Sequence, residues 1–318
     1  MVVINFVSIG LQLLYLNKLM ESRYQAFLLI LASIVLILII YLNLPATVLK
    51  GLVTKNDRWT MIASGDVMLG RTVLTTSLNK KDPTYPFLFV GESLKSADIT
   101  FVNLESPIVA DCPRYSTGLK FCADPEMIDG LVFAGVDVVT LANNHIGNFG
   151  TTGIDQTKVY LADKGIDSTL NNLSVKHIKG IDVGFVGLNL VDRKTLTDQE
   201  INLIRDSRTK VDYLVVAPHW GYEYQSNASK FQVQMAKSII ESGADLILGS
   251  HPHWVQNIEY INQKPVYYSL GNFVFDQMWS EQTKRGLVVK FEFEGVKLVK
   301  EEQMPIYMAN WAQPVWKF

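Results

Sequence analysis

The sequence predicts an α/β fold in which largely parallel strands alternate with helices that lie outside the sheets. Two observations lead to this prediction. Short aliphatic and β-branched runs alternate along the chain with segments of helical periodicity. Most of these runs end in a cluster of polar residues, as strands do where a sheet meets a ligand site. With 318 residues, of which 48% are hydrophobic, the chain can bury one large core or two small ones.

Charge and cysteine content limit the classes of partner. The net charge of −2 gives no basic excess, so nucleic acid is not expected as a partner. Cys112 and Cys122 are the two cysteines, and a structural zinc site needs four ligands in close pairs, so they do not form one. A location outside the cytoplasm would allow them to form a disulfide, and the alternative is two unpaired thiols.

Residues 25–44 are predicted to form a single transmembrane anchor. No charged residue occurs from Tyr24 to Leu49, and Pro45 ends the apolar run. A helix rises about 1.5 Å per residue, so about 20 apolar residues cross a hydrocarbon core of about 30 Å. The run has no polar face, unlike a helix packed on a soluble core. A cleaved signal peptide is disfavoured, because the run is too long and no small-x-small site follows it.

Residues 1–24 form a short amino-terminal segment that is largely apolar. Its first 17 residues carry no charge, so they form either a second membrane or interfacial segment or upstream sequence before a start at Met20. Basic residues lie on both sides of the anchor, at positions 18 and 23 before it and 50, 55 and 58 after it. Their balance leaves the orientation of the anchor open.

The region 57–318 has the composition of a globular α/β domain, and its first half contains three strands that run into polar clusters. The strands are 59–63, 98–102 and 136–141, and the clusters are 64–71, 103–107 and 142–145. Helical patterns at 125–133 and 152–164 lie between or after these strands.

The second half repeats this organisation around a third helical pattern at 228–242. Its strands are 211–216, 244–248 and 264–268, and its clusters are 218–221, 249–253 and 269–276. In folds of this class the carboxyl ends of strands gather the ligand site. The six polar clusters are therefore expected to converge.

The residue types in these clusters favour a metal site. The chain has five histidines, and four of them, all except His177, lie in the clusters. Imidazole, carboxylate and amide oxygen together suit Mn, Zn or Fe better than Ca. The proposed ligands of one or two divalent ions are Asp66, Glu105, Asn144, His219, His251 and His253. His145 remains as a general acid, and Arg71 as a group that holds an anionic part of the substrate.

Each of these residues also has a structural interpretation. Asp66 would be a turn residue, Asn143 and Asn144 would occupy left-handed backbone positions, His219 would be a hydrogen-bonded core histidine, and Glu105 would be solvated. Arg71 would form a surface salt bridge. His177 has no companions and is interpreted as structural. The metal hypothesis depends on the joint pattern rather than on any one member.

Seven segments in order resemble motifs of the CapA family of poly-γ-glutamate capsule biosynthesis proteins, related to calcineurin-like metallophosphoesterases. They are Gly-Asp-Val-Met-Leu-Gly-Arg (65–71), Asn-Leu-Glu-Ser-Pro (103–107), Lys-Phe-Cys-Ala-Asp-Pro-Glu (120–126), the segment 135–145 ending in Asn-Asn-His, His-Trp-Gly-Tyr-Glu-Tyr (219–224), Gly-Ser-His-Pro-His (249–253) and Ser-Leu-Gly-Asn-Phe-Val-Phe-Asp (269–276). The match covers about 59–310.

The resemblance implies a four-layer α-β-β-α metallophosphoesterase-like sandwich at 57–318, anchored by the amino-terminal helix in the cell membrane as a single-pass protein. It places the main domain outside the cytoplasm, which the charges flanking the anchor could not do. It also implies an anionic polymer such as poly-γ-glutamate as partner, together with the membrane subunits that synthesise and export it.

The chain departs from the wider phosphoesterase pattern in two places. Asp66-Val67-Met68 replaces Asp-x-His, and Asn103-Leu104-Glu105 replaces Gly-Asp-x-x-Asp, so one nitrogen ligand is missing. The later motifs match at the Asn-His pair 144–145, at His219 and at the His-Pro-His segment 251–253. One ion is expected on this basis, and a second depends on substitutes for the missing ligands.

Three functions fit this pattern. The first is a metal-dependent hydrolase or transferase in capsule biosynthesis, in which a bound metal lowers the pKa of a water molecule. The second is a non-catalytic subunit that binds the polymer or assembles the export complex. The third is a metallophosphoesterase that acts on another substrate.

Overall fold

The computed structural model describes residues 31, 33–35, 58–114 and 117–317, and the chain divides into two compact units, 1–55 and 56–318. In the first unit the described residues are helical and exposed. Apart from these four residues, the predicted anchor at 25–44 and the segment 1–24 lie outside the described part of the chain. Among the described residues, no helix has both the length and the hydropathy needed to cross a membrane.

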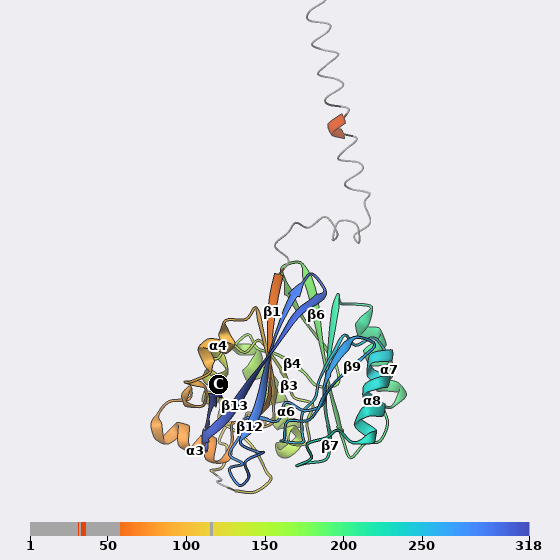
Figure 1. The fold of residues 1–318 in the computed structure, drawn as a ribbon. Coiled ribbons are helices and arrows are strands. Elements are labelled where there is room, and N and C mark those ends of the chain that lie inside the picture. The colour runs from red at the N-terminus through yellow and green to blue at the C-terminus, as the bar shows by residue number, and fades with distance from the viewer. Residues whose placement is uncertain (1–30, 32, 36–57, 115–116, 318) are drawn as a thin grey trace, which may run out of the picture. The chain divides into compact units, whose positions relative to one another are not determined.

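The second unit contains two β-sheets (Figure 1). The larger has eight strands in the order β14-β13-β12-β1-β2-β3-β4, and β11 pairs with β1 beside this path. The strands are β1 (Arg58–Val67), β2 (Ile99–Leu104), β3 (Val138–Thr140), β4 (Asp167–Thr169), β11 (Asn272–Val274), β12 (Arg285–Glu294), β13 (Lys297–Asn310) and β14 (Gln313–Trp316). β1, β2, β3, β4 and β11 run parallel to one another, whereas β12, β13 and β14 pair in antiparallel fashion.

The smaller sheet has six strands in the order β5-β6-β7-β8-β10-β9. They are β5 (Leu173–Ile178), β6 (Ile181–Val191), β7 (Tyr213–Gly221), β8 (Leu246–Leu248), β9 (Ile258–Ile261) and β10 (Lys264–Tyr267). The four central strands are parallel, and the edge strands β5 and β9 are antiparallel to their neighbours.

The α/β class is confirmed, but the prediction of largely parallel sheets is wrong for a substantial part of the molecule. Both sheets are mixed. Strands β12, β13 and β14 follow one another with short turns and no helix between them, and a short turn can only join antiparallel neighbours. The same holds for the hairpins β5–β6 and β9–β10.

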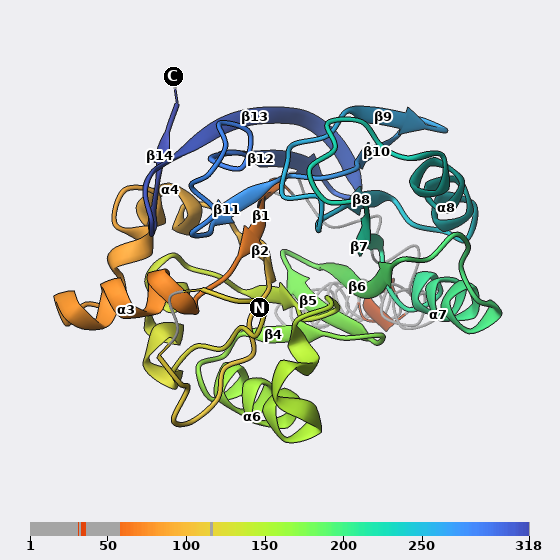
Figure 2. The ribbon, with the colours of Figure 1, turned by 90° about the horizontal axis from the view of Figure 1, so that it is seen from below.

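Helices cover the outer face of each sheet. Those on the larger sheet are α3 (Arg71–Lys80), α4 (Gly91–Lys95), α5 (Ile128–Phe133) and α6 (Gly150–Asp163), with the 3₁₀ turns η1 (Tyr85–Phe87), η2 (Pro125–Met127) and η3 (Ile146–Phe149). The smaller sheet carries α7 (Asp198–Arg208) and α8 (Lys230–Glu241). Figure 2 shows the two sheets facing each other between these helices. The helical patterns at 125–133, 152–164 and 228–242 are therefore confirmed to within a few residues.

Three apolar clusters hold these layers together, and the period-two alternation of the strands decides which residue enters which. On β1, Met61 belongs to the cluster between the sheets, whereas its neighbour Ile62 faces α3–α6. On β7, Val215 points inward, whereas Val216 packs under α7 and α8. Strands buried on both faces are apolar throughout, which is why they appear as continuous apolar runs in the sequence.

Candidate metal centre

The carboxyl ends of β1 and β2 bring two acidic side chains together. Asp66 pairs in register with Asn103 on one side and with Asn272 on the other, and Glu105 follows β2 directly. The close approach requires glycine at position 65, because a Cβ there would lie 1.8 Å from the carbonyl oxygen of Gly271. Asp66 and Glu105 are fully buried.

Asn103 positions both carboxylates. Its Nδ2 donates to Asp66 Oδ1 at 2.8 Å and to Glu105 Oε2 at 3.3 Å. Its Oδ1 accepts from Asn143 Nδ2 at 3.2 Å. One oxygen of each acid is thereby held by Asn103, and the other points into the cluster.

Three histidines surround the free oxygen of Glu105. The Nε2 atoms of His145, His219 and His253 each lie 3.9 Å from Glu105 Oε1. Two ligands bonded to one ion at about 2.0–2.2 Å are at most about 4.4 Å apart, so 3.9 Å is compatible with a shared cation. Asp66, Glu105 and His253 each offer a ligand atom, and these atoms lie within 4.8 Å of one another.

The backbone at the His-Pro-His segment is in an unusual conformation. His251 has φ 97° and His253 has φ 58°, a region that residues other than glycine rarely adopt. Such positions cost of order 1–3 kcal/mol each and concentrate at functional sites. This conformation places His253 beside an acid, with its Nδ1 3.2 Å from Asp66 Oδ2, and His251 beside His219, with ring centroids 4.9 Å apart.

The polar atoms without partners fit a bound cation. Asp66 Oδ2, Glu105 Oε1 and His251 Nδ1 are buried and have no hydrogen-bond partner among the described residues. A buried acceptor that remains unsatisfied costs about 1–3 kcal/mol, so native proteins rarely leave several of them in one place. A divalent ion would satisfy all three types of group, and the mixed nitrogen and oxygen donor set suits Mn, Zn or Fe.

Burial also sets the protonation of these groups in the direction that metal binding needs. Burial, with the nearby histidines adding to it, lowers the pKa of His219 well below its ordinary value and that of His251 to about 4. Both imidazoles are therefore neutral at neutral pH, which is the form that coordinates metal. Burial and the neighbouring Asp66 raise the pKa of Glu105, so two acids here without a cation are electrostatically unfavourable.

Asn144 belongs to the same cluster. Its Oδ1 lies 2.9 Å from His219 Nε2, and the opposite nitrogen of that ring, Nδ1, lies 2.8 Å from Ser250 Oγ. Three structural interpretations are wrong. Asp66 lies in strand β1 rather than in a turn, Glu105 is buried rather than solvated, and neither Asn143 nor Asn144 has a left-handed backbone. Asn143 instead caps the turn at His145 and Ile146 through its Oδ1.

Arg71 lies at the edge of the cluster. Its guanidinium forms an ion pair with Asp276, donates to the carbonyl oxygen of Gly118 at 2.8 Å and stacks over Phe121 at 4.6 Å. The Phe121 ring also stacks on His145, with centroids 3.9 Å apart. The roles of Arg71 and His145 toward a substrate stay predictions.

Several residues of the site were not predicted as site residues. Asn272 Oδ1 lies 3.0 Å from His253 Nδ1, and Asn272 Nδ2 donates to Gln277 Oε1 at 3.1 Å. Ser250 and Asn103 hold His219 and the acids in the same way. Asn103, Ser250 and Asn272 lie in the same polar clusters at strand ends from which the ligands were predicted. Their side chains are neutral, so the sequence does not distinguish them from ordinary polar residues.

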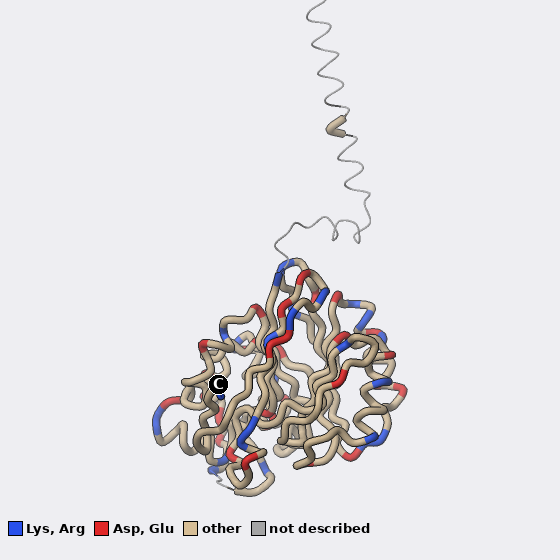
Figure 3. Tube along the Cα trace, in the orientation of Figure 1, with Lys and Arg blue, Asp and Glu red and all other residues tan. Residues whose placement is uncertain are grey.

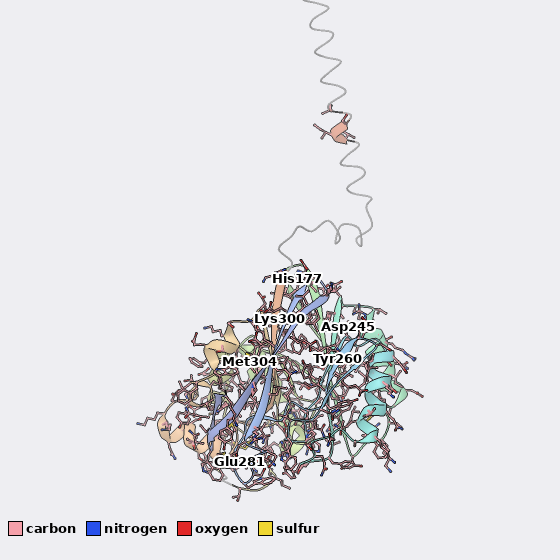
Figure 4. All side chains as sticks on the ribbon, viewed as in Figure 1. His177, Asp245, Tyr260, Glu281, Lys300 and Met304 are labelled. Carbon is pink, nitrogen blue, oxygen red and sulfur yellow. A yellow bond between two sulfur atoms is a disulfide. The ribbon has the colours of Figure 1, made fainter. Side chains whose placement is uncertain are left out.

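The fifth histidine and the two cysteines lie outside the cluster. His177 is exposed, pairs with Asp182 at 2.7 Å and lies at the opposite end of this unit from Glu281 (Figure 4). Its structural interpretation is therefore consistent with its position. Cys112 and Cys122 form a disulfide, which closes the loop that carries Gly118 and Phe121.

Fold and site together define an α/β protein of two facing mixed sheets with a buried Asp/Glu/His cluster at the carboxyl ends of its strands. Residues 60–277 match the family model described as bacterial capsule synthesis protein PGA_cap, and the chain belongs to this family.

Two relatives and one solved structure extend this result. The chain is similar to the capsule biosynthesis protein CapA of Bacillus anthracis, at 28% identity over 304 residues, covering 86% of this chain and 74% of that protein. It is 27% identical over 248 residues to the PGA biosynthesis protein CapA of Bacillus subtilis, covering 70% of this chain and 65% of the relative. A hypothetical protein from Thermus thermophilus shares the fold, with a TM-score of 0.53 at 15% identity over 77% of this chain and 98% of that one.

Proposed function

We propose that this protein acts in the biosynthesis or export of an anionic capsule polymer such as poly-γ-glutamate, through a metal-dependent hydrolase-type site. Membership of the capsule synthesis family supports the process. The observation that carries the chemistry is the buried cluster in which oxygen atoms of Asp66 and Glu105 lack partners and face three imidazoles. The proposal includes the assignment of the two facing sheets and their outer helices to a four-layer α-β-β-α sandwich of the metallophosphoesterase type.

The proposed ligands are Asp66, Glu105, Asn144, His219, His251 and His253. A bound divalent ion would supply Lewis acidity and an activated water. A full two-ion centre would need another ligand in place of the histidine that Met68 replaces. The Met68 side chain is buried, and its sulfur is already engaged by the backbone N–H of Gly70. One tightly held ion is the arrangement that these residues favour.

The remaining polar groups would orient the substrate and move protons. His145 lies at the mouth of the cluster, held between the Phe121 ring and Asn148, whose Oδ1 is 3.3 Å from His145 Nδ1. We assign to its Nε2 the role of general acid toward the leaving group. Arg71 is fixed by Asp276 and would orient an anionic group of the substrate.

We also propose a single-pass protein of the cell membrane with unit 56–318 outside the cytoplasm. The uncharged run at 25–44 supports the anchor. The Cys112–Cys122 disulfide supports the compartment, because disulfides persist in oxidising surroundings and are rare in the cytosol. Membrane synthesis and export subunits of the polymer are the proposed partners.

The test combines elemental analysis with hydrolysis assays on the purified full chain. Bound Mn, Zn or Fe is expected, together with metal-dependent cleavage of a phosphodiester or of a γ-linked glutamate polymer. His251→Ala is expected to lose both. His177→Ala is the matched control, since His177 is exposed and outside the cluster, and it should keep both.

The two alternatives predict different results in the same experiment. A metal-free, inactive chain that still restores capsule export would establish an assembly or polymer-binding subunit and overturn the enzymatic proposal. Metal-dependent phosphodiester cleavage in a chain without effect on any polymer would instead identify a metallophosphoesterase with another substrate. Asp66 Oδ2 and Glu105 Oε1 favour the first proposal over a metal-free subunit, because neither has a hydrogen-bond partner among the described residues.

A further inference from the structure

A second concave site lies along the seam between the two sheets. It has a volume of about 460 Å³, within the range of about 300–1,000 Å³ that is typical of ligand pockets. Residues 255–258 contribute one wall and lead into β9 of the smaller sheet. Residues 285–287 of β12, with Gln303, Pro305 and Ile306 of β13, form the other wall, which belongs to the larger sheet, and Lys317 closes the site. We call this site the seam groove.

The charge of the seam groove is one-sided. Arg285 and Lys317 line it, and none of the described residues that line it is acidic. Neither cation has an ion pair with any carboxylate among the described residues, although Lys317 Nζ lies 5.4 Å from the Tyr307 ring centroid. Elsewhere on this unit basic and acidic residues are interspersed (Figure 3).

Two acids in neighbouring segments are engaged by other groups. Glu301 on β13 accepts from the hydroxyls of Tyr260, at 3.1 Å, and Tyr267, at 2.5 Å. Glu281 pairs with Lys284 at 2.7 Å. A hydrogen bond from Lys284 lowers the pKa of Glu281, and the nearby charge of Arg285 adds to this effect. Arg285 and Lys317 are nevertheless exposed and line an open groove.

The floor between these cations is apolar. Val255, Ile258, Leu287 and Ile306 line it, and Leu287 and Ile306 are buried. A small inorganic anion would leave this surface uncovered. An occupant that satisfies the whole groove needs carboxylates to meet the cations and short aliphatic stretches between them to cover the floor.

The seam groove adjoins the metal centre through one residue. Gly271 packs against both walls of the groove: a Cβ on it would lie 3.0 Å from the nitrogen of Val255 and 3.1 Å from the oxygen of Arg285. The carbonyl oxygen of the same glycine accepts from the backbone N–H of Asp66 at 2.9 Å. Val255 also follows His253 closely in the chain, so a ligand in the groove lies next to the segment that carries the proposed metal ligands.

We infer that the seam groove binds a segment of γ-linked polyglutamate, with its carboxylates at Arg285 and Lys317 and its methylene groups over the apolar floor. This inference rests on the proposed function for the choice of polymer. Its charge complementarity and its volume come from the groove itself. It makes the groove a holding site for the polymer, separate from the proposed metal-dependent chemistry.

The test measures binding of a fluorescently labelled, short γ-linked oligoglutamate to the purified full chain by fluorescence anisotropy. Binding is expected to weaken roughly tenfold in Arg285→Ala and again in the double variant with Lys317→Ala, since each lost charge-assisted hydrogen bond has about this effect on affinity. It should also weaken as salt increases. Lys158→Ala with Lys237→Ala is the matched control, because it removes two exposed cations of α6 and α8 that do not line the groove.

Several outcomes would overturn the inference. These are no binding to the wild type at low salt, equal loss in the control pair, and binding that depends on His251 and added Mn rather than on Arg285. Equal affinity for an α-linked oligoglutamate of the same charge would show a non-specific electrostatic contact and would also overturn it. Thermal unfolding checks that each variant is folded. Metal content and hydrolysis are measured on the same samples, so failure of the groove and failure of the metal-dependent proposal are separable.

Discussion

Carboxylate side chains lie at both ends of the parallel strands, but their hydrogen bonding differs between the two ends. At the amino ends, Asp98, Asp137, Asp212 and Asp245 precede β2, β3, β7 and β8. Each accepts the backbone N–H of a residue on the neighbouring strand through its Oδ2, at 2.8–2.9 Å. The N–H of each aspartate donates in turn to the carbonyl oxygen of that same residue.

At the carboxyl ends the corresponding oxygens have no such partner. Asp66 Oδ2 and Glu105 Oε1 are buried without a hydrogen bond among the described residues, and imidazoles rather than backbone N–H groups face them. The amino-end carboxylates thus stabilise strand pairing, whereas the carboxyl-end carboxylates carry an electrostatic cost that a cation would remove. The carboxyl-end acids are fully buried and the amino-end aspartates only partly buried, so burial and missing hydrogen bonds together distinguish the two sets.

The largest effect that the comparison predicts is on metal binding by Glu105→Gln. The amide keeps the size of the side chain and can still accept from Asn103, but it loses the charge that the cluster offers a cation. Metal affinity should fall by about 100-fold or more, and the metal-free protein should unfold with the same or a slightly higher free energy, because an uncompensated buried charge is gone. Metal titration and chemical denaturation in chelator measure the two quantities. Unchanged affinity would remove Glu105 from the ligand set.

Asp245→Ala, at the amino end of β8, should lower stability and leave metal affinity unchanged, the reverse of Glu105→Gln. The change leaves the buried N–H of Leu214 without its acceptor and removes the partner of Arg208, at 3.0 Å, and of Lys264, at 3.1 Å. The free energy of unfolding should fall by about 2–4 kcal/mol, while metal affinity stays unchanged. Asp245→Asn, which keeps an acceptor for Leu214, should lose less. A loss of metal binding in the folded Asp245→Ala protein would contradict the separation of the two ends.

The disulfide lies at the carboxyl end of the strands. Its loss should lower the free energy of unfolding somewhat less than Asp245→Ala does. Cys112 and Cys122 close a short loop, for which the chain-entropy model gives about 2–3 kcal/mol. Thermal unfolding of the wild type with and without a thiol reductant measures this contribution. The double variant Cys112→Ser, Cys122→Ser should match the reduced wild type and be insensitive to reductant. A wild type that is equally insensitive would show that the bond contributes nothing to folding.

Much of the site was predictable, because one geometric rule gathers it. Parallel strands place their carboxyl ends along one edge, so the polar clusters at 66, 105, 219 and 253 could be expected from the sequence alone to meet. The pattern of an apolar run that ends in polar residues was sufficient for this purpose. The helices at 125–133, 152–164 and 228–242 followed from their periodicity and from glycines near their ends.

What could not be predicted depends on contacts between distant residues. Arg71 was expected either to hold an anionic group of the substrate or to form a salt bridge, but the sequence did not identify its partner Asp276, which lies 205 positions away. The sequence does not show that Asp98 accepts a backbone hydrogen bond through its Oδ2 whereas Asp66 Oδ2 accepts none, since the acceptor role of Asp98 depends on Thr60 on another strand. The antiparallel β12–β14 region was not predicted, because its strands are joined by short turns rather than by the helices that the alternating pattern required.

The smallest predicted effect is the pH dependence of Asp98. Burial alone would raise the pKa of this carboxyl, but hydrogen bonds from Lys179 and Thr60 outweigh it and lower the pKa below the ordinary 3.8. A lowered folded-state pKa gives stability that is present above about pH 4 and is lost as the pH falls through the folded-state value. The free energy of unfolding of the wild type should therefore be about 1 kcal/mol higher than that of Asp98→Asn at pH 7. This difference should become smaller as the pH falls. Asp129→Asn, an exposed acid paired with Lys164, is the control and should show a smaller difference at every pH. If the difference in free energy of unfolding between the wild type and Asp98→Asn stays constant down to about pH 3, the carboxylate charge does not contribute to it. Packing would then account for the stability that the amino-end aspartates provide.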